Sequence, residues 1–239
     1  MVIARNIDFT GNYPIVSGNA SGLYNISSGT KEYKFVDVTL GTTGTATAVV
    51  TSSSAVFGLL NGLKLGTGAY QRIGNKIAMK SLYTSVTFGM SSAENDSTVD
   101  LNVNNRPVRF MIVYDKQTNG SLPVIGDLLS AFSGVDNNVG RAIDINSPNN
   151  LNNRDRFIVL MDKRFVLQSH GTTARHIKKY KRLNTSVAYK SGATVGDVTD
   201  ITTGGLYYLA FCDIDLGNVT DPLSVITMTG DIRLRYQDD

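Results

Sequence analysis

The sequence contains few of the residues on which disulfide-stabilised or metal-stabilised proteins depend. It has no tryptophan, one cysteine, two histidines and five prolines in 239 residues. A single cysteine excludes an intrachain disulfide, and Cys212 lies in an apolar run where a small buried side chain is expected. Two histidines and one cysteine are too few for an ordinary zinc site. Neither disulfides nor zinc are therefore expected to stabilise the fold.

Long hydrophobic runs and a strong net charge are also missing. No apolar run approaches the roughly 18 residues needed to cross a membrane, and the N-terminus lacks the pattern of a signal peptide. No membrane partner is therefore expected. Charged residues make up 18% of the chain and hydrophobic residues 41%, which favours a folded core over general disorder. The formal net charge is only +3, so binding of nucleic acid by bulk charge is not indicated.

What the chain does contain is a series of short apolar stretches, several of which alternate with the two-residue period of β-strands. Strands are predicted for residues 34–40, 77–88, 108–114, 157–167, 206–212 and 226–236. Residues 175–189 have apolar spacing that fits a helix or a strand, and a strand is predicted because β-branched and aromatic residues dominate the second half. A change of parity near Ser81 predicts a bulge or a strand covered on both faces. The charged triplet Asp162–Arg164 predicts a bend within the strand 157–167.

The remaining segments are less regular. Residues 45–51 form a weaker strand candidate, and residues 56–65 fit a short helix or a loop beneath the sheet. A helix is predicted over residues 122–133, because its apolar residues share one helical face and Pro123 lies near its start. Residues 1–30 are expected to form an arm, and residues 31–239 a single domain. The pattern alone predicts an all-β antiparallel sandwich or barrel with one connecting helix, whose eighth strand has no unique position.

The densest charge cluster lies in residues 175–182, where five cations occur within eight residues. Closely spaced cations repel one another unless an anion neutralises them, so a phosphate backbone is a candidate partner. A solvated strand face that aids solubility explains the same pattern. Arg233 and Arg235 form a smaller stripe, for which salt bridges across a subunit contact are an equal alternative. The candidate nucleic-acid-binding residues are Arg175, Lys178, Lys179, Lys181 and Arg182, with Arg5 and Lys34 as weaker additions.

Catalytic and metal sites are not expected. The chain has no strand-turn-helix nucleophile elbow, and the glycines of residues 62–68 form no phosphate loop followed by lysine. Asp213, Asp215 and Asp221 could hold calcium at a subunit contact, but exposed turn carboxylates explain them better. We therefore predict that the protein is not an enzyme and has no catalytic residues, no metal ligands and no cofactor.

An ordered set of motifs carries a family resemblance over most of residues 34–237. RIGNKI at residues 72–77, followed by RPVRFMIVYDKQTNGSLP at residues 106–123, resembles the capsid proteins of small circular single-stranded DNA viruses that encode a replication initiator. These motifs are also similar to the shell domains of satellite tobacco necrosis virus and its relatives. RDRFIVLMDKRFVL at residues 154–167 and GGLYYLAFCDID at residues 204–215 follow in the same order.

The resemblance implies an eight-stranded jelly roll of the viral coat type, with one short helix in a connection, that self-assembles into an icosahedral shell. It also implies a packaged genome, single-stranded DNA in these relatives, held by contacts blind to sequence. The expected locations are the virion and the host nucleus, with residues 176–183 as an import signal. Such capsids commonly begin with an arginine-rich arm, whereas Arg5 is the one lysine or arginine among the first 30 residues here. Either an arm has been removed, or the shell binds its genome through its inner surface.

The competing class is a jelly-roll binding module of the carbohydrate-binding type, acting as a monomer or trimer. Such a module is expected to display exposed aromatic residues in a groove. Here tryptophan is absent, and the tyrosines mostly fall within strand patterns.

Overall fold

The computed structural model describes residues 33–41, 48–50, 55–92, 105–131, 143–168, 171–212 and 224–238. The arm expected over residues 1–30, including Arg5, and the aspartates Asp213, Asp215 and Asp221 lie outside the described residues. Among the residues that are described, no helix is long and apolar enough to cross a membrane. No cluster of possible metal ligands occurs among them either.

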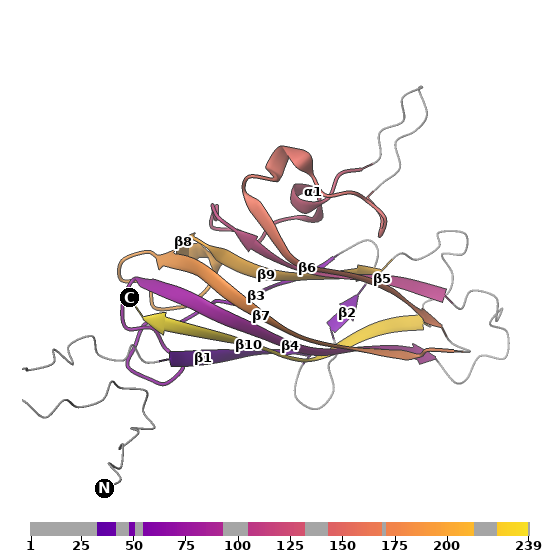
Figure 1. Ribbon diagram of the computed structural model, residues 1–239, viewed down its shortest axis with the longest axis horizontal. Helices are drawn as coiled ribbons and strands as arrows, with labels where there is room; N and C mark the ends of the chain where they lie inside the picture. The colour runs from indigo at the N-terminus through magenta and orange to yellow at the C-terminus, as the bar shows by residue number, and fades with distance from the viewer. Residues whose placement is uncertain are drawn as a thin grey trace, which may run out of the picture. The chain divides into compact units, whose positions relative to one another are not determined.

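Two antiparallel sheets lie face to face (Figure 1). The larger sheet has six strands, in the order β1 (Tyr33–Leu40), β10 (Ser224–Asp238), β4 (Lys76–Ser92), β7 (Ala174–Tyr189) and β8 (Ile201–Thr203), with β2 (Ala48–Val50) also paired to β10. The smaller sheet has the order β3 (Val56–Leu59), β9 (Gly205–Cys212), β5 (Asn105–Asp115) and β6 (Phe157–Gln168).

The strand order is that of a jelly roll. The first and last strands, β1 and β10, are neighbours in one sheet, and β4 and β7 complete its long strands. Along the chain, β5 and β6 lie between β4 and β7. They pair with each other in the opposite sheet, where β9 pairs with β5. With β3, this gives eight principal strands in two interleaved Greek keys, and the predicted fold class is confirmed.

The eighth strand is β3, in a segment for which a helix or loop was predicted. Val56 and Phe57 pair with Ala210 and Leu209 of β9, which supplies hydrogen-bond partners along its open edge. The prediction was wrong for residues 56–59 because local composition does not show which sheet edge needs a partner. The strands predicted for residues 34–40, 108–114, 175–189, 206–212 and 226–236 are confirmed.

The predicted helix over residues 122–133 is much shorter than its apolar spacing indicated. Within the described part of that range, residues 122–131, only α1 (Ile125–Leu128) is helical, and Leu129 is already extended. Leu128 and Leu129 are both buried, and the chain next pairs with the connection that follows, since Ser130 N–H donates to the carbonyl of Pro148 at 2.9 Å. Packing against this connection ends the helix early, so the tertiary contact overrides the helical spacing.

The expected bulge is confirmed and the expected bend is not. The register of β4 against β7 shifts between Met79 and Ser81. By contrast, β6 continues through Asp162–Arg164, and its register shift falls opposite Ile112 and Val113. The triplet is charged because this strand lies at the edge of its sheet, where polar side chains remain in water.

The core between the sheets follows the period of each strand. In β10 the alternate residues Ile226, Met228, Ile232, Leu234 and Tyr236 are buried. The strand β5 is buried on both faces, which explains its unbroken apolar run. Phe110 packs edge-on against Phe88 of the opposite sheet, with ring centres 5.4 Å apart. On the other face of β5, Arg109 donates hydrogen bonds to the carbonyls of Ile145 and Ser147. Segment 143–147 therefore covers the outer face of the smaller sheet.

A fully buried arginine joins three connections at one end of the larger sheet. Arg72 donates to the carbonyls of Leu63 (3.3 Å), Gly74 (2.6 Å) and Ala193 (2.6 Å). Its guanidinium carbon lies 4.2 Å from the centre of the Tyr189 ring. Burial raises the pKa of Tyr189, so its hydroxyl stays protonated and donates to the carbonyl of Asn61 at 2.8 Å. Arg72 therefore supplies the hydrogen bonds that these irregular segments cannot make among themselves.

Replacing Arg72 by methionine is expected to lower the free energy of unfolding by about 3 kcal/mol, because one buried and two partly buried carbonyls lose their donor. Urea denaturation of the full chain measures this change. The control is Arg154→Met at a largely exposed position, where a change within about 0.5 kcal/mol is expected. Equal midpoints for the two variants would contradict the role given to Arg72.

Candidate nucleic-acid interface

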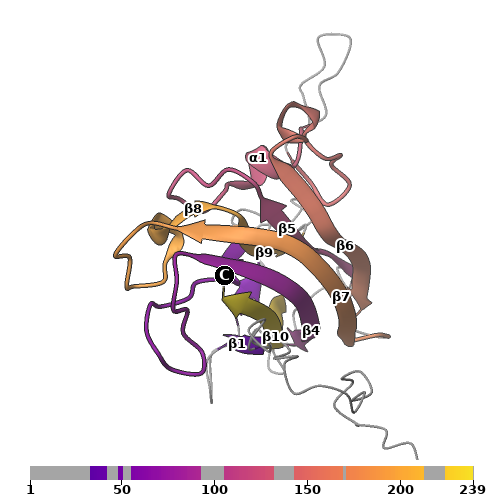
Figure 2. The ribbon, with the colours of Figure 1, turned by 60° about the vertical axis from the view of Figure 1, so that its left-hand side comes forward.

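The basic cluster of residues 175–182 is part of β7, which runs beside β4 (Figure 2). Alternate β7 residues Ile177, Leu183 and Val187 are buried, so odd-numbered positions face the opposite sheet and even-numbered positions face outward. The five cations are therefore divided between two faces. Lys178 and Arg182 point outward, while Arg175, Lys179 and Lys181 share the inner parity.

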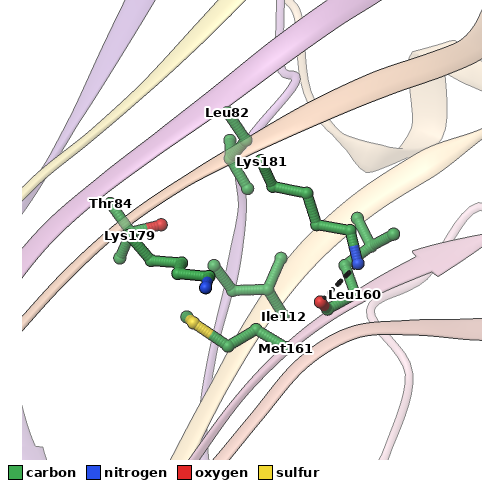
Figure 3. Close-up of a pocket in the computed structure, with 7 residues that line it drawn as sticks. All are labelled: Leu82, Thr84, Ile112, Leu160, Met161, Lys179 and Lys181. Atoms are coloured by element: carbon green, nitrogen blue, oxygen red, sulfur yellow. Dashed lines mark hydrogen bonds between the residues drawn. The ribbon is translucent and has the colours of Figure 1, made fainter.

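The inward lysines border a pocket of about 230 Å³ between the two sheets. Its other lining residues are mostly apolar, and Figure 3 shows them: Leu82, Thr84, Ile112, Leu160 and Met161. The ammonium group of Lys181 donates to the carbonyl of Leu160 at 2.7 Å (Figure 3). Lys181 thus joins β7 to β6 across the open side of the sandwich, which is a structural role.

On the outward face, three rows of paired residues cross β10, β4 and β7. The central row contains Arg233, Tyr83 and Tyr180, with Tyr83 in the middle. In one neighbouring row Ser85 lies between Asp231 and Lys178, and in the other Ser81 lies between Arg235 and Arg182. We call this group the basic-aromatic surface, defined by Tyr83, Tyr180, Lys178, Arg182, Arg233 and Arg235.

The cations of this surface differ in how their charges are balanced. Arg233 makes two hydrogen bonds of 2.7 Å to the Asp37 carboxylate, and these bonds raise the pKa of Arg233. The pairing lies within one chain, so no subunit contact is needed to explain Arg233. Lys178 and Arg182 are exposed and form no ion pair with any residue that the structure describes. Their charge is left for solvent or for an external anion.

The weaker candidate Lys34 lies elsewhere. Its side chain is only 6% exposed, and its ammonium group lies 2.8 Å from the Asp238 carboxylate and donates to the carbonyl of Gln71 at 3.0 Å. Lys34 therefore joins β1 to the C-terminal end of β10 and to the connection before β4. Genome contact by Lys34 stays a prediction, and the structure gives it an internal role.

Sequence reasoning did not identify the tyrosines of the surface. Tyr180 carried a signal, since it alternates with Lys178 and Arg182 on one strand face. Tyr83 carried none, because its position beside Tyr180 depends on the register of β4 against β7. Only the pairing of distant strands reveals this arrangement.

Two interleaved Greek keys of antiparallel strands define a jelly-roll fold. Residues 21–239 match the family described as "Geminivirus coat protein/nuclear export factor BR1 family". The chain therefore belongs to this family. It is a viral capsid protein that forms the shell around a genome and is found in the virion. The predictions of a coat protein and of a non-enzymatic function are confirmed.

Solved viral proteins give only distant likenesses. A structure of Desmodium yellow mottle tymovirus is 12% identical, with 85% of this chain and 86% of that chain covered and a TM-score of 0.31. The VP1 pentamer of human polyomavirus 6 is 7% identical, with coverage of 87% and 94% and a TM-score of 0.30. With TM-scores this low the likenesses carry no argument, and the fold assignment rests on strand order. No curated protein matches the chain.

Replacing Lys34 by methionine separates its structural role from genome contact. We expect the free energy of unfolding to fall by about 1–3 kcal/mol, because a buried cation and its two partners are lost. The affinity for a single-stranded oligonucleotide is expected to change less than about twofold, since the charge is not accessible to phosphate. Lys178→Met, on the outward face of β7, should weaken the affinity for the oligonucleotide and leave the free energy of unfolding nearly unchanged. A loss of affinity in Lys34→Met without a loss of stability would assign Lys34 to the interface.

Proposed function

We propose that this capsid protein self-assembles into a small icosahedral shell and binds single-stranded DNA without sequence preference through the outward cations of β7. The observation that carries the proposal is that Lys178 and Arg182 are exposed on β7 and form no ion pair with any described residue. The resemblance of residues 106–123 to capsids of circular DNA viruses that encode a replication initiator supports the choice of genome.

The charge distribution supports phosphate as the partner. Arg72, Arg109 and Arg156 are satisfied by carbonyls or carboxylates within the chain, and Arg233 is paired with Asp37. Cations left unpaired on one strand repel each other, and a polyanion removes that repulsion while releasing its own counterions. Lysine and arginine contacts to phosphate carry no base information, so a genome of any sequence is accepted. Arg175 and Lys179 on the inner parity are also without an ion-pair partner among the described residues and extend the same proposal.

Self-assembly predicts a large, uniform particle. Size-exclusion chromatography with light scattering on the full chain is expected to give a megadalton peak, and negative-stain electron microscopy of that peak should show spheres of one size. Excess absorbance at 260 nm across the peak would reveal captured nucleic acid. A peak of one to three subunits at every salt concentration and pH tested would contradict the shell.

Phosphate binding predicts a specific change in salt dependence. The double variant Lys178→Gln, Arg182→Gln is expected to make the slope of log affinity against log salt shallower by about 1.4 for a single-stranded oligonucleotide, roughly 0.7 for each lost contact. Fluorescence anisotropy of labelled oligo-dT with unassembled full chain measures the slope. The control Lys116→Gln, Arg154→Gln makes the same charge change at exposed positions of the other sheet's connections. Equal slopes in both variants would rule out the β7 contact.

The same cations bear on location within the host cell. We infer that residues 176–183 serve as a nuclear import signal before assembly, because their even-numbered cations face outward in the unassembled subunit. A fluorescent fusion of the double variant Lys178→Gln, Arg182→Gln is then expected to accumulate less in the nucleus than the wild-type fusion. Unchanged accumulation would reject this signal.

A further inference from the structure

Two tyrosines occupy the centre of the basic-aromatic surface. Tyr83 of β4 and Tyr180 of β7 are directly paired, so their Cβ atoms are roughly 5 Å apart on the outward face. Tyr180 is 55% exposed, and Tyr83 is half-buried beside it. The exposed part of the Tyr180 ring leaves apolar surface in water that a stacked partner would bury.

The other aromatic residues on this face already have partners. The Arg233 guanidinium lies 4.5 Å from the centre of the Phe35 ring, and that of Arg235 lies 4.8 Å from the Tyr33 ring. Tyr70 packs edge-on against Phe35 with ring centres 5.2 Å apart. Among the residues that the structure describes, neither Tyr83 nor Tyr180 makes an aromatic or cation–π contact. Their faces are therefore the open ones on this surface.

Cations surround this tyrosine pair at regular spacing. Lys178 and Arg182 are each two residues from Tyr180 on the same strand face, roughly 6.7 Å along the strand. Arg233 is paired to Tyr83 on its other side. An open aromatic face flanked by unpaired cations matches the two chemical parts of a nucleotide, a flat base and a phosphate.

We propose that Tyr83 and Tyr180 form a base-stacking platform for single-stranded nucleic acid, with Lys178 and Arg182 holding the flanking phosphates. This inference rests on the proposed phosphate contact of β7 and adds selectivity for strandedness. In a duplex the base faces are already stacked on one another, so a flat platform reaches them only in a single strand. Stacking tolerates every base because each has a π-face, which preserves the lack of sequence preference.

Charge argues for nucleic acid over a neighbouring subunit as the occupant. Lysine is depleted at protein–protein interfaces, whereas Lys178 lies beside Tyr180 on the same strand face. Burying Lys178 and Arg182 under protein would require carboxylates from the partner, since none of the described residues pairs with them. A phosphate backbone provides an anion at every nucleotide.

The test compares a 15-nucleotide oligo-dT with an abasic oligonucleotide of the same length, which keeps the phosphates and removes the bases. The unassembled full chain is expected to bind oligo-dT more tightly than the abasic strand. Tyr180→Leu should weaken oligo-dT binding by roughly 5- to 150-fold, the range for loss of one base–aromatic stack, and leave abasic binding and the salt slope unchanged. Tyr180→Phe keeps the ring and should retain wild-type binding. Leu151→Ala, at another exposed apolar position, controls for general surface effects.

The outcomes separate this inference from the phosphate contact. Equal wild-type affinity for oligo-dT and the abasic strand, with the salt slope still reduced in the Lys178, Arg182 variant, would overturn stacking alone. Absence of any slope change in that variant would overturn the phosphate contact as well. If Tyr180→Leu prevents particle assembly but leaves the preference for oligo-dT intact, the platform is a subunit contact and the inference fails. Photocrosslinking of a 5-iododeoxyuridine strand to Tyr83 or Tyr180 would support it directly.

Discussion

The structure depends on one constraint, the two-residue period of the strands that enclose the core. Each long strand must turn alternate side chains into the space between the sheets, as β10 does with Ile226 to Tyr236. The same rule determines where charge can be placed. In β7 it divides a cluster that is continuous in sequence, directing Lys178 and Arg182 outward and Lys179 and Lys181 toward the open side of the sandwich.

The basic residues consequently serve two separate purposes. Arg72 binds three carbonyls, Arg109 pairs with Asp162 while binding two further carbonyls, and Arg156 pairs with Asp115. These residues fix irregular segments to the sheets and offer little charge to a ligand. The formal net charge of +3 therefore says little about binding. What matters for a polyanion is the small number of cations that remain unpaired on one outward face.

The sequence predicted the secondary structure well wherever a strand has one solvent-exposed face and one buried face. The alternation in β1 and β10 specified both the strand and its buried side, and the order of the motifs in residues 72–215 identified the kind of protein. Segments governed by distant contacts were not predictable. Val56–Leu59 become a strand because β9 lies beside them, and α1 ends early because Leu129 pairs with Asn149. The Tyr83–Tyr180 pair depends on the register between β4 and β7, which no local pattern encodes.

The charged triplet in β6 has a consequence for how copies of the chain can associate. The strand β6 forms one edge of the smaller sheet, so the backbone groups along its free side are available to another strand. Asp162, Lys163 and Arg164 stand in the middle of that edge, and Asp162 is already bound to Arg109 from within the chain. Adding a strand from another copy would crowd these charges and remove water from them. The charged triplet thereby disfavours the addition of a strand from another copy along the β6 edge, and with it sheet growth into fibres from that side.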